Sequence, residues 1–100
     1  MSTYKFKWDH NKATSNITKH QITFEEAKTV FYDDYARLIP DPDSSFGEER
    51  FILLGQSANL KTLIVCHCYL DADEEIVRII SARKASKHER KQYEGFNHAR

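Results

Sequence analysis

The stretch Arg78-Ile-Ile-Ser-Ala-Arg83-Lys84-Ala-Ser86, followed by Glu89-Arg90 and Tyr93, has the pattern of a strand that runs directly into a helix. Ser86 and Glu89 have the spacing of a capping box, in which the serine caps the helix and the glutamate reaches back to the serine amide. Two arginines and a lysine are thereby delivered to one end of a sheet. Because guanidinium groups match phosphate oxygens bidentately, the junction indicates a site for a nucleic-acid backbone.

Periodicity and turn residues predict the other elements. Tyr4–Trp8 alternates aromatic residues with lysine, as a short half-buried strand does. Asp9 is the expected N-cap of a helix over 10–20, and Thr23 with Glu26 forms a second capping-box pattern before a helix over 24–31. Strands are predicted over 35–39, 48–56, 60–69 and 75–83, separated by a loop at 40–45 and turns at 57–59 and 70–73, and a helix over 87–97 follows.

This order, β-α-α-β-β-β-β-α, predicts an α+β fold with a mainly antiparallel sheet and helices packed on it. Helices would cover one face of the sheet, and the other face would stay open to a ligand. The 100 residues are expected to form one domain, residues 1–100.

Composition favours a soluble protein of a reducing compartment. Hydrophobic residues make up 40% of the chain and charged residues 30%. No apolar run approaches the roughly 18–20 residues of a membrane span, and no signal peptide precedes the first predicted strand. Cys66 and Cys68 are too close in one predicted strand to form an ordinary disulfide, so we expect a cytoplasmic location.

Charge is unevenly distributed although the formal net charge is zero. Residues 76–100 contain seven Lys and Arg against Glu89 and Glu94, whereas residues 31–50 are mainly acidic. Such a basic end can bind an anion locally, although for charge runs in general a salt-bridged surface is the preferred interpretation.

RNA can be cleaved without a metal when its own 2′-hydroxyl attacks the phosphorus. The reaction needs a base, an acid and cations around a crowded phosphorane. The candidates for holding the phosphate are Arg83, Arg50 and Arg78, with Lys84 beside them. Strict alternation puts Arg78 and Arg83 on opposite faces, so either the strand contains a bulge or only one of them lines the site. Arg78 could instead pair with Glu48 or Glu49, and Glu49 with Arg50 could be an ordinary surface pair.

Proton transfer would fall to His20, His67 or Glu49. His67 lies in the most apolar predicted strand, where a hydrogen-bonded core histidine is the alternative. The run Cys66-His67-Cys68 is not read as a zinc site, because alternation separates its ligands and no fourth ligand is suitably spaced. No metal or cofactor is predicted.

Further residues are candidate nucleic-acid contacts. Lys12 and Lys19 lie two helical turns apart and would form a basic edge beside the sheet, unless that edge is simply a solvated helix face. Arg90 and Tyr93 lie on the last predicted helix. The aromatic residues of Tyr4–Trp8 could stack on bases, but burial in the core is preferred.

These motifs together resemble the BrnT-type toxins over about Phe6–Tyr93. The opening matches are Phe6-Lys-Trp8-Asp9-His-Asn11-Lys12-Ala13, Asn16-Ile-Thr-Lys19-His20 and Ile22-Thr-Phe24-Glu25-Glu26-Ala27. The later ones are Glu49-Arg50 with Gly55, Arg78 to Ala85, Glu89-Arg90 and Tyr93. One departure is Gln21, at a position that is often glycine in such sequences and that would close the first helix in a left-handed conformation.

The resemblance implies a RelE-like fold and the toxin of a bacterial type II toxin–antitoxin system, acting as an endoribonuclease that inhibits growth. It also implies a BrnA-type antitoxin with a ribbon-helix-helix DNA-binding region, a heterotetrameric complex, and repression of the shared promoter by that complex. Two alternatives stay open. One is a non-catalytic module that binds RNA or the ribosome, and the other is a co-repressor that binds only the antitoxin.

Overall fold

The residues described by the computed structural model, 3–42 and 49–98 with side chains up to residue 95, form a five-stranded sheet flanked by helices. The elements are β1 (Lys5–Lys7), α1 (His10–His20), α2 (Phe24–Thr29), the 3-10 turn η1 (Val30–Tyr32), β2 (Arg37–Pro40), β3 (Phe51–Gln56), β4 (Thr62–Tyr69), β5 (Ile76–Lys84) and α3 (Lys87–His98). The predicted α+β order is confirmed, and the RelE-like assignment stays a prediction. The predicted strand start at Glu48 and the loop residues 43–45 lie outside the described residues.

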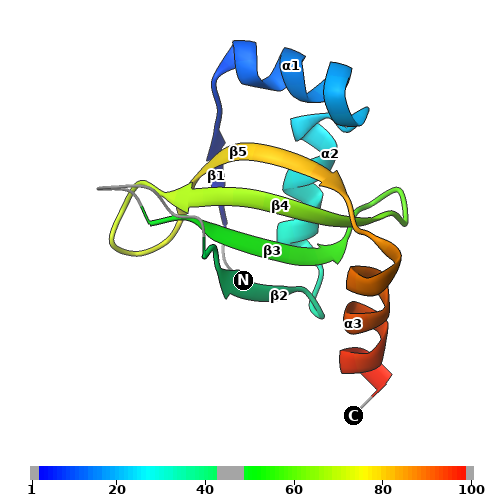
Figure 1. Cartoon of the computed structure of the whole chain (residues 1–100). Coiled ribbons are helices and arrows are strands. Elements are labelled where there is room, and N and C mark those ends of the chain that lie inside the picture. Colours follow the sequence, from blue (N-terminus) through cyan, green and yellow to red (C-terminus); the bar gives the residue numbers. More distant parts are fainter. Residues whose placement is uncertain (1–2, 43–48, 99–100) are drawn as a thin grey trace.

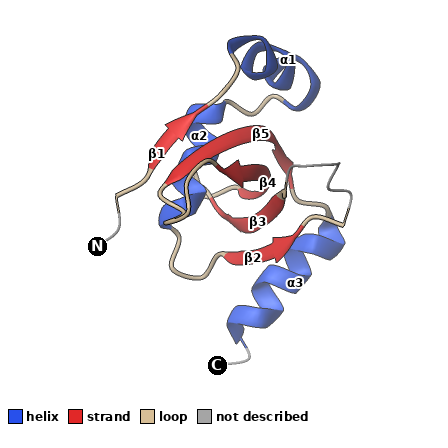
Figure 2. Cartoon of the chain, turned by 90° about the vertical axis from the view of Figure 1, so that its left-hand side faces the viewer, coloured by secondary structure: helices blue, strands red, loops and turns tan. Residues whose placement is uncertain are grey.

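Strand order in the sheet is β1-β5-β4-β3-β2. The predicted, mainly antiparallel sheet is confirmed, because β2 to β5 pair antiparallel in sequence order. β1 pairs parallel with residues 76–78 at the start of β5. Figure 1 shows α2 behind the sheet and α3 at its right-hand end, and Figure 2 shows α2 and α3 on opposite sides of the sheet.

One face of the sheet, here called the covered face, packs against α2 and the segments around it. Ile22, Phe24, Ala27 and Val30 meet alternate residues of the central strands in the main core. Those strand residues are Leu53, Leu63, Val65, Val77, Ile79 and Ala82. Tyr4, Phe6 and Trp8 pack at the margin of this core, so the preferred prediction for the aromatic strand is confirmed.

The helix caps agree with the sequence except at one residue. Asp9 accepts from the amides of Asn11 and Lys12, at 2.7 and 3.2 Å. Thr23 Oγ1 accepts from the amide of Glu26 at 3.0 Å, but the Glu26 carboxylate bonds to Ser57 Oγ at 2.7 Å instead of returning to Thr23. The reciprocal half of that capping box was therefore predicted wrongly, because tertiary packing offers Glu26 a partner on the β3–β4 turn.

Asn16 of α1 closes the part of β5 that extends beyond β1. Its Nδ2 donates to the carbonyls of Ala82 and Ile22 at 2.8 and 2.9 Å, and its Oδ1 accepts from the amide of Ala82 at 3.0 Å. The side chain is 4% exposed. It thus replaces a neighbouring strand for one residue of β5 and fixes α1 to the sheet.

Candidate nucleic-acid interface

A β-bulge brings Arg78 and Arg83 to the same face of β5. The register with β4 shifts between Cys66, which pairs with Ser81, and His67, which pairs with Ile79. Ile80 is therefore the extra residue, and Arg78 and Arg83 oppose Cys68 and Ile64. Because Ile64 and Cys68 share a strand parity, both arginines project to the face opposite α2. This side of the sheet, outside the part under α3, is called the open face below.

Arg83 is held at the start of α3 by a two-pronged ion pair. Its Nη1 and Nη2 donate to Glu89 Oε1 and Oε2 at 2.8 and 2.9 Å. Glu89 Oε1 also accepts from the amide of Ser86 at 2.8 Å, and Ser86 Oγ accepts from the amide of Glu89 at 3.1 Å, which confirms the predicted capping box. The hydrogen bonds from Arg83 lower the pKa of Glu89 to about 2, and the same contact raises the pKa of Arg83. The guanidinium is thus charged and fixed in orientation.

Arg50 lies on the open face near Cys66. The next residue, Phe51, stacks toward His67 on the covered face, so alternation directs Arg50 to the other side. The charge of Arg50 acts on the Cys66 thiol, whose Sγ contacts Asp41 Oδ2 at 3.6 Å. Burial, followed by the Asp41 carboxylate, raises the pKa of Cys66 to about 11. Cys66 is therefore a neutral thiol, not a nucleophile, at physiological pH.

Lys7 is a cation of this face that sequence analysis did not single out. It pairs with Arg78 in the parallel β1–β5 register, and partners across a sheet project to the same side. The alternating aromatic and lysine residues of β1 were the available signal, because the buried aromatic positions direct the lysines outward. The other predicted explanation for Arg78, a pair with Glu48 or Glu49, stays a prediction, because Glu48 lies outside the described residues.

The basic edge of α1 lies where it was predicted. Lys12, Lys19 and His20 line a small open cavity of about 170 Å³ together with Ser15, Asn16, Ile80 and Ser81. Ser81 also hydrogen-bonds to the Cys66 side chain. The α1 cavity therefore adjoins the open face through Ser81. Glu49, the remaining acid–base candidate, is exposed and immediately precedes Arg50.

His67 lies on the covered face, apart from the arginines. It is 0% exposed. Its ring packs edge-on against Phe31 and Tyr69, with Nδ1 at 3.2 Å from the Val65 carbonyl and Nε2 at 3.3 Å from the Tyr69 hydroxyl. Burial lowers its pKa to about 4. The prediction of an active-site role for His67 is replaced by the alternative of a core histidine, because the sheet separates it from the open face.

Tyr93 anchors α3 instead of presenting a ring to solvent. It is 8% exposed and packs with Leu54 and Ile64 on the sheet. Its hydroxyl donates to Asp33 Oδ2 at 2.7 Å. This placement does not fit the predicted direct contact of Tyr93 with nucleic acid, since its aromatic face is used by the protein itself.

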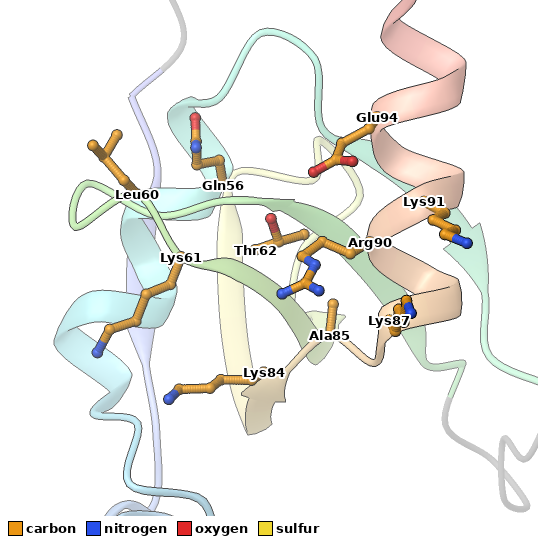
Figure 3. Close-up of a pocket in the computed structure, with 10 residues that line it drawn as sticks. All are labelled: Gln56, Leu60, Lys61, Thr62, Lys84, Ala85, Lys87, Arg90, Lys91 and Glu94. Carbon is orange, nitrogen blue, oxygen red and sulfur yellow. The ribbon is translucent and has the colours of Figure 1, made fainter.

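A second basic hollow lies at the end of the sheet, between the β3–β4 turn and α3. This hollow, called the α3 pocket, is open and has a volume of about 580 Å³. Among the described residues, five cations and one carboxylate line it: Lys61, Lys84, Lys87, Arg90, Lys91 and Glu94. Figure 3 shows these side chains together with the other residues that line the pocket. Lys84 and Arg90 were predicted contacts. The other three cations were not predicted. Lys61 is far from α3 in sequence, and the positions of Lys87 and Lys91 indicated only a charged helix surface.

Among the residues that the structure describes, one acidic group could hold a metal ion: Asp71, Asp73 and Glu75, on the β4–β5 turn. Asp71 Oδ1 there accepts from the amides of Glu75 and Ile76 at 3.0 and 2.8 Å, which accounts for it as a turn-forming residue. No helix in the described part of the chain is sufficiently long and apolar to cross a bilayer.

Comparison with known proteins places the chain in a family. The family model described as "Ribonuclease toxin, BrnT, of type II toxin-antitoxin system" matches residues 8–89. The crystal structure of the Brucella abortus ribonuclease toxin BrnT is similar, with a TM-score of 0.65 and 25% sequence identity, over 85% of this chain and 100% of that one. No curated protein sequence matches the chain. The mixed α and β fold and the matched residues agree, and the protein belongs to the BrnT family of ribonuclease toxins of type II toxin–antitoxin systems.

Proposed function

We propose that the protein is a metal-independent endoribonuclease whose active site is the open face of the sheet. The observation that carries the proposal is the bulge at Ile80, which puts Arg78 and Arg83 on one face together with Arg50. Three guanidinium groups on a surface that α2 does not cover suit a phosphodiester and the extra negative charge of its phosphorane.

The proposed reaction is transesterification within the RNA. A base removes the proton of the 2′-hydroxyl, the 2′-oxygen bonds to phosphorus, and the bond from phosphorus to the 5′-oxygen breaks. An acid gives a proton to that leaving oxygen, so the products are a 2′,3′-cyclic phosphate and a 5′-hydroxyl. No metal is needed if cations hold the non-bridging oxygens.

Arg83 is the best-positioned phosphate ligand. Glu89 occupies one donor on each terminal nitrogen at 2.8 and 2.9 Å, and the guanidinium has further N–H groups for a phosphate. The side chain is 44% exposed, so substrate can reach it. His20 is the preferred proton-transfer group, because it is exposed at the α1 cavity that adjoins the open face, and Glu49 beside Arg50 is the second candidate.

Cleavage of a defined RNA in EDTA tests this proposal. We expect discrete fragments ending in a cyclic phosphate from the parent, and a loss of about 10²–10³-fold for Arg78→Gln and Arg83→Gln. Lys28→Gln is the matched control, because it also removes one positive charge, from α2 on the covered side of the sheet. Arg78→Gln gives the clearer result, because Arg83 also supports the start of α3 and its substitution could change the fold as well as the site. Undiminished cleavage by Arg78→Gln and Arg83→Gln would contradict the site.

His20→Gln tests the proton-transfer assignment separately. We expect a loss of about 10²-fold or more and the disappearance of one limb of the pH–rate profile. Unchanged rate and profile would move the role to Glu49, for which Glu49→Gln is the corresponding variant. Intact RNA with the parent protein itself would favour a binding module over an enzyme.

We also propose that the partner is a BrnA-type ribbon-helix-helix antitoxin, in a heterotetramer that represses its own promoter. Membership in a type II system supports a protein antitoxin in general. We expect the pair to act in the cytoplasm, where the thiols of Cys66 and Cys68 stay reduced. Co-expression, molar mass by light scattering and promoter-DNA binding by the complex would test the assembly. A toxin that elutes alone beside a folded antitoxin would argue against it.

A further inference from the structure

The α3 pocket collects positive charge, most of which takes no part in an ion pair within the described residues. Lys84, Lys87, Arg90 and Lys91 form no ion pair with another residue in the described part of the chain. Lys61 has a distant pair with Glu26, at 3.7 Å. Among the residues that the structure describes, Glu94 is the one carboxylate that lines the pocket. In a protein with a formal net charge of zero, this concentration of cations indicates an anionic ligand.

The cations come from three separate parts of the fold and converge on one hollow. Lys61 is on the β3–β4 turn, Lys84 ends β5, and the other three lie on α3. In Figure 3 Arg90 extends from α3 toward the space between α3 and the β3–β4 turn, whereas Lys84 points away from α3, toward the side of Lys61. The hollow is open and about 580 Å³ in volume, which suits an extended chain of phosphates better than a small enclosed anion.

The pocket is continuous with the proposed active site along the backbone. Lys84 follows Arg83 directly, and Arg83 Nη1 donates to the Lys84 carbonyl at 3.2 Å. Neighbouring residues of a strand project to opposite sides, so the β5–α3 junction has a cation on each side. A polyanion held by Arg83 can therefore pass around this junction into the α3 pocket.

We infer that the α3 pocket is a second RNA-binding subsite, which holds the phosphate backbone of the strand next to the scissile bond. The inference rests on the proposed ribonuclease function and extends it. The enzyme then prefers RNA long enough to occupy both places. Base identity is not read here, because the cations that line the pocket bind phosphates.

Binding to 2′-O-methyl RNA separates this inference from the chemistry, because such RNA lacks the attacking hydroxyl. We would measure fluorescence anisotropy with fluorescein-labelled oligomers of about 4 and about 16 nucleotides. The variant Lys87→Gln/Arg90→Gln/Lys91→Gln should weaken binding of the longer oligomer by about 100-fold at 0.1 M salt. Its salt slope should fall by about 2, because each phosphate contact on a single strand contributes about 0.7.

Three comparisons make the result specific. The triple variant should cleave the short RNA at the parent rate while its KM for the long RNA rises. Glu94→Gln should tighten binding of the long oligomer, whereas the charge-matched control Lys28→Gln should leave the length dependence unchanged. A thermal melt checks that the triple variant is folded.

Equal affinity of parent and triple variant for the long oligomer would overturn the subsite. So would a loss confined to antitoxin binding, which would assign the pocket to an acidic protein segment. If the parent cleaves no RNA but its binding still depends on the α3 cations, the subsite stands and the proposed chemistry falls.

Discussion

At the scale of single residues, His67 shows how burial turns a candidate catalytic group into a structural one. The ring is 0% exposed, and burial lowers its pKa from 6.5 to about 4. The unfolded chain therefore takes up this proton first as the pH falls. The free energy of unfolding should decrease from about pH 6.5 to about pH 4 on this account, by about 3 kcal/mol at roughly 1.4 kcal/mol per pKa unit.

Denaturant unfolding of the parent and of His67→Phe across that pH range would measure the effect. The variant should lose this part of the pH dependence, whatever its stability at pH 7. His67→Gln also has no side chain that takes up a proton in this pH range, so it should lose the same part of the pH dependence. Agreement between the two variants would show that the effect comes from titration of the histidine and not from a change in packing. An identical pH slope in all three proteins would show that the histidine titrates normally.

Asn16 is the other residue whose side chain replaces backbone pairing. Asn16→Ala leaves the amide and carbonyl of Ala82 without their side-chain partner in a buried setting. At about 1–3 kcal/mol for each such group, we expect a loss of at least about 2 kcal/mol in the free energy of unfolding. The exposed neighbour provides the control, since Ser15→Ala should change stability by less than about 0.5 kcal/mol. A loss below 1 kcal/mol for Asn16→Ala would contradict this role.

At the scale of elements, Gly55 permits the close contact between β3 and the segment that follows η1. A Cβ atom there would lie 2.8 Å from Ala36 Cβ and 2.9 Å from Val30 Cγ1. Gly55→Ala should therefore cost about 1–3 kcal/mol through overpacking. Gly95 of α3 is the matched control, because a Cβ there meets nothing within 4 Å, and Gly95→Ala should stabilise the helix by about 0.5–1 kcal/mol. Thermal melts showing equal shifts for the two variants would refute the contact.

The start of α3 depends on Glu89, which serves both the capping box and Arg83. Because the folded pKa of Glu89 is about 2 against 4.5 otherwise, its stabilisation is complete above about pH 4.5 and is lost as the pH falls toward 2. Glu89→Gln should cost about 1–2 kcal/mol at neutral pH, a modest figure because solvent screens the half-exposed Arg83. Glu94→Gln on the same helix should cost much less. Urea unfolding of the parent and of Glu89→Gln at pH 7 and pH 3 would measure this effect. If the two proteins differed in free energy of unfolding by the same amount at both pH values, the role of Glu89 would be contradicted.

At the scale of the whole molecule, the sheet has one covered face and one face available for a ligand. α2 and the segments around it cover one side, and α3 covers only one end of the other. Because the formal net charge is zero, the proposed RNA binding would rest on local cations of the open face and the α3 pocket, with little long-range attraction. Binding should therefore depend on a few arginines and lysines and not on the overall charge.

The amino-acid sequence is sufficient to predict the order of elements, the two faces of most strands and the capping box of α3. These features depend on neighbours a few residues apart, so local patterns such as Ser86 with Glu89 are sufficient to predict them. It also supplied Arg83, Arg78 and Arg50 as candidates and the resemblance to BrnT.

Which candidate residues lie close together depends on the folded arrangement of the strands and helices. The bulge at Ile80 results from the register with β4, and no local pattern in β5 reveals it. His67 and Tyr93 carry the chemistry of a site, but packing against Phe31 and hydrogen bonding to Asp33 assign them to the core and to the anchor of α3. The α3 pocket joins residues from separate elements. Long-range contacts decide each of these points, and a linear pattern does not contain them.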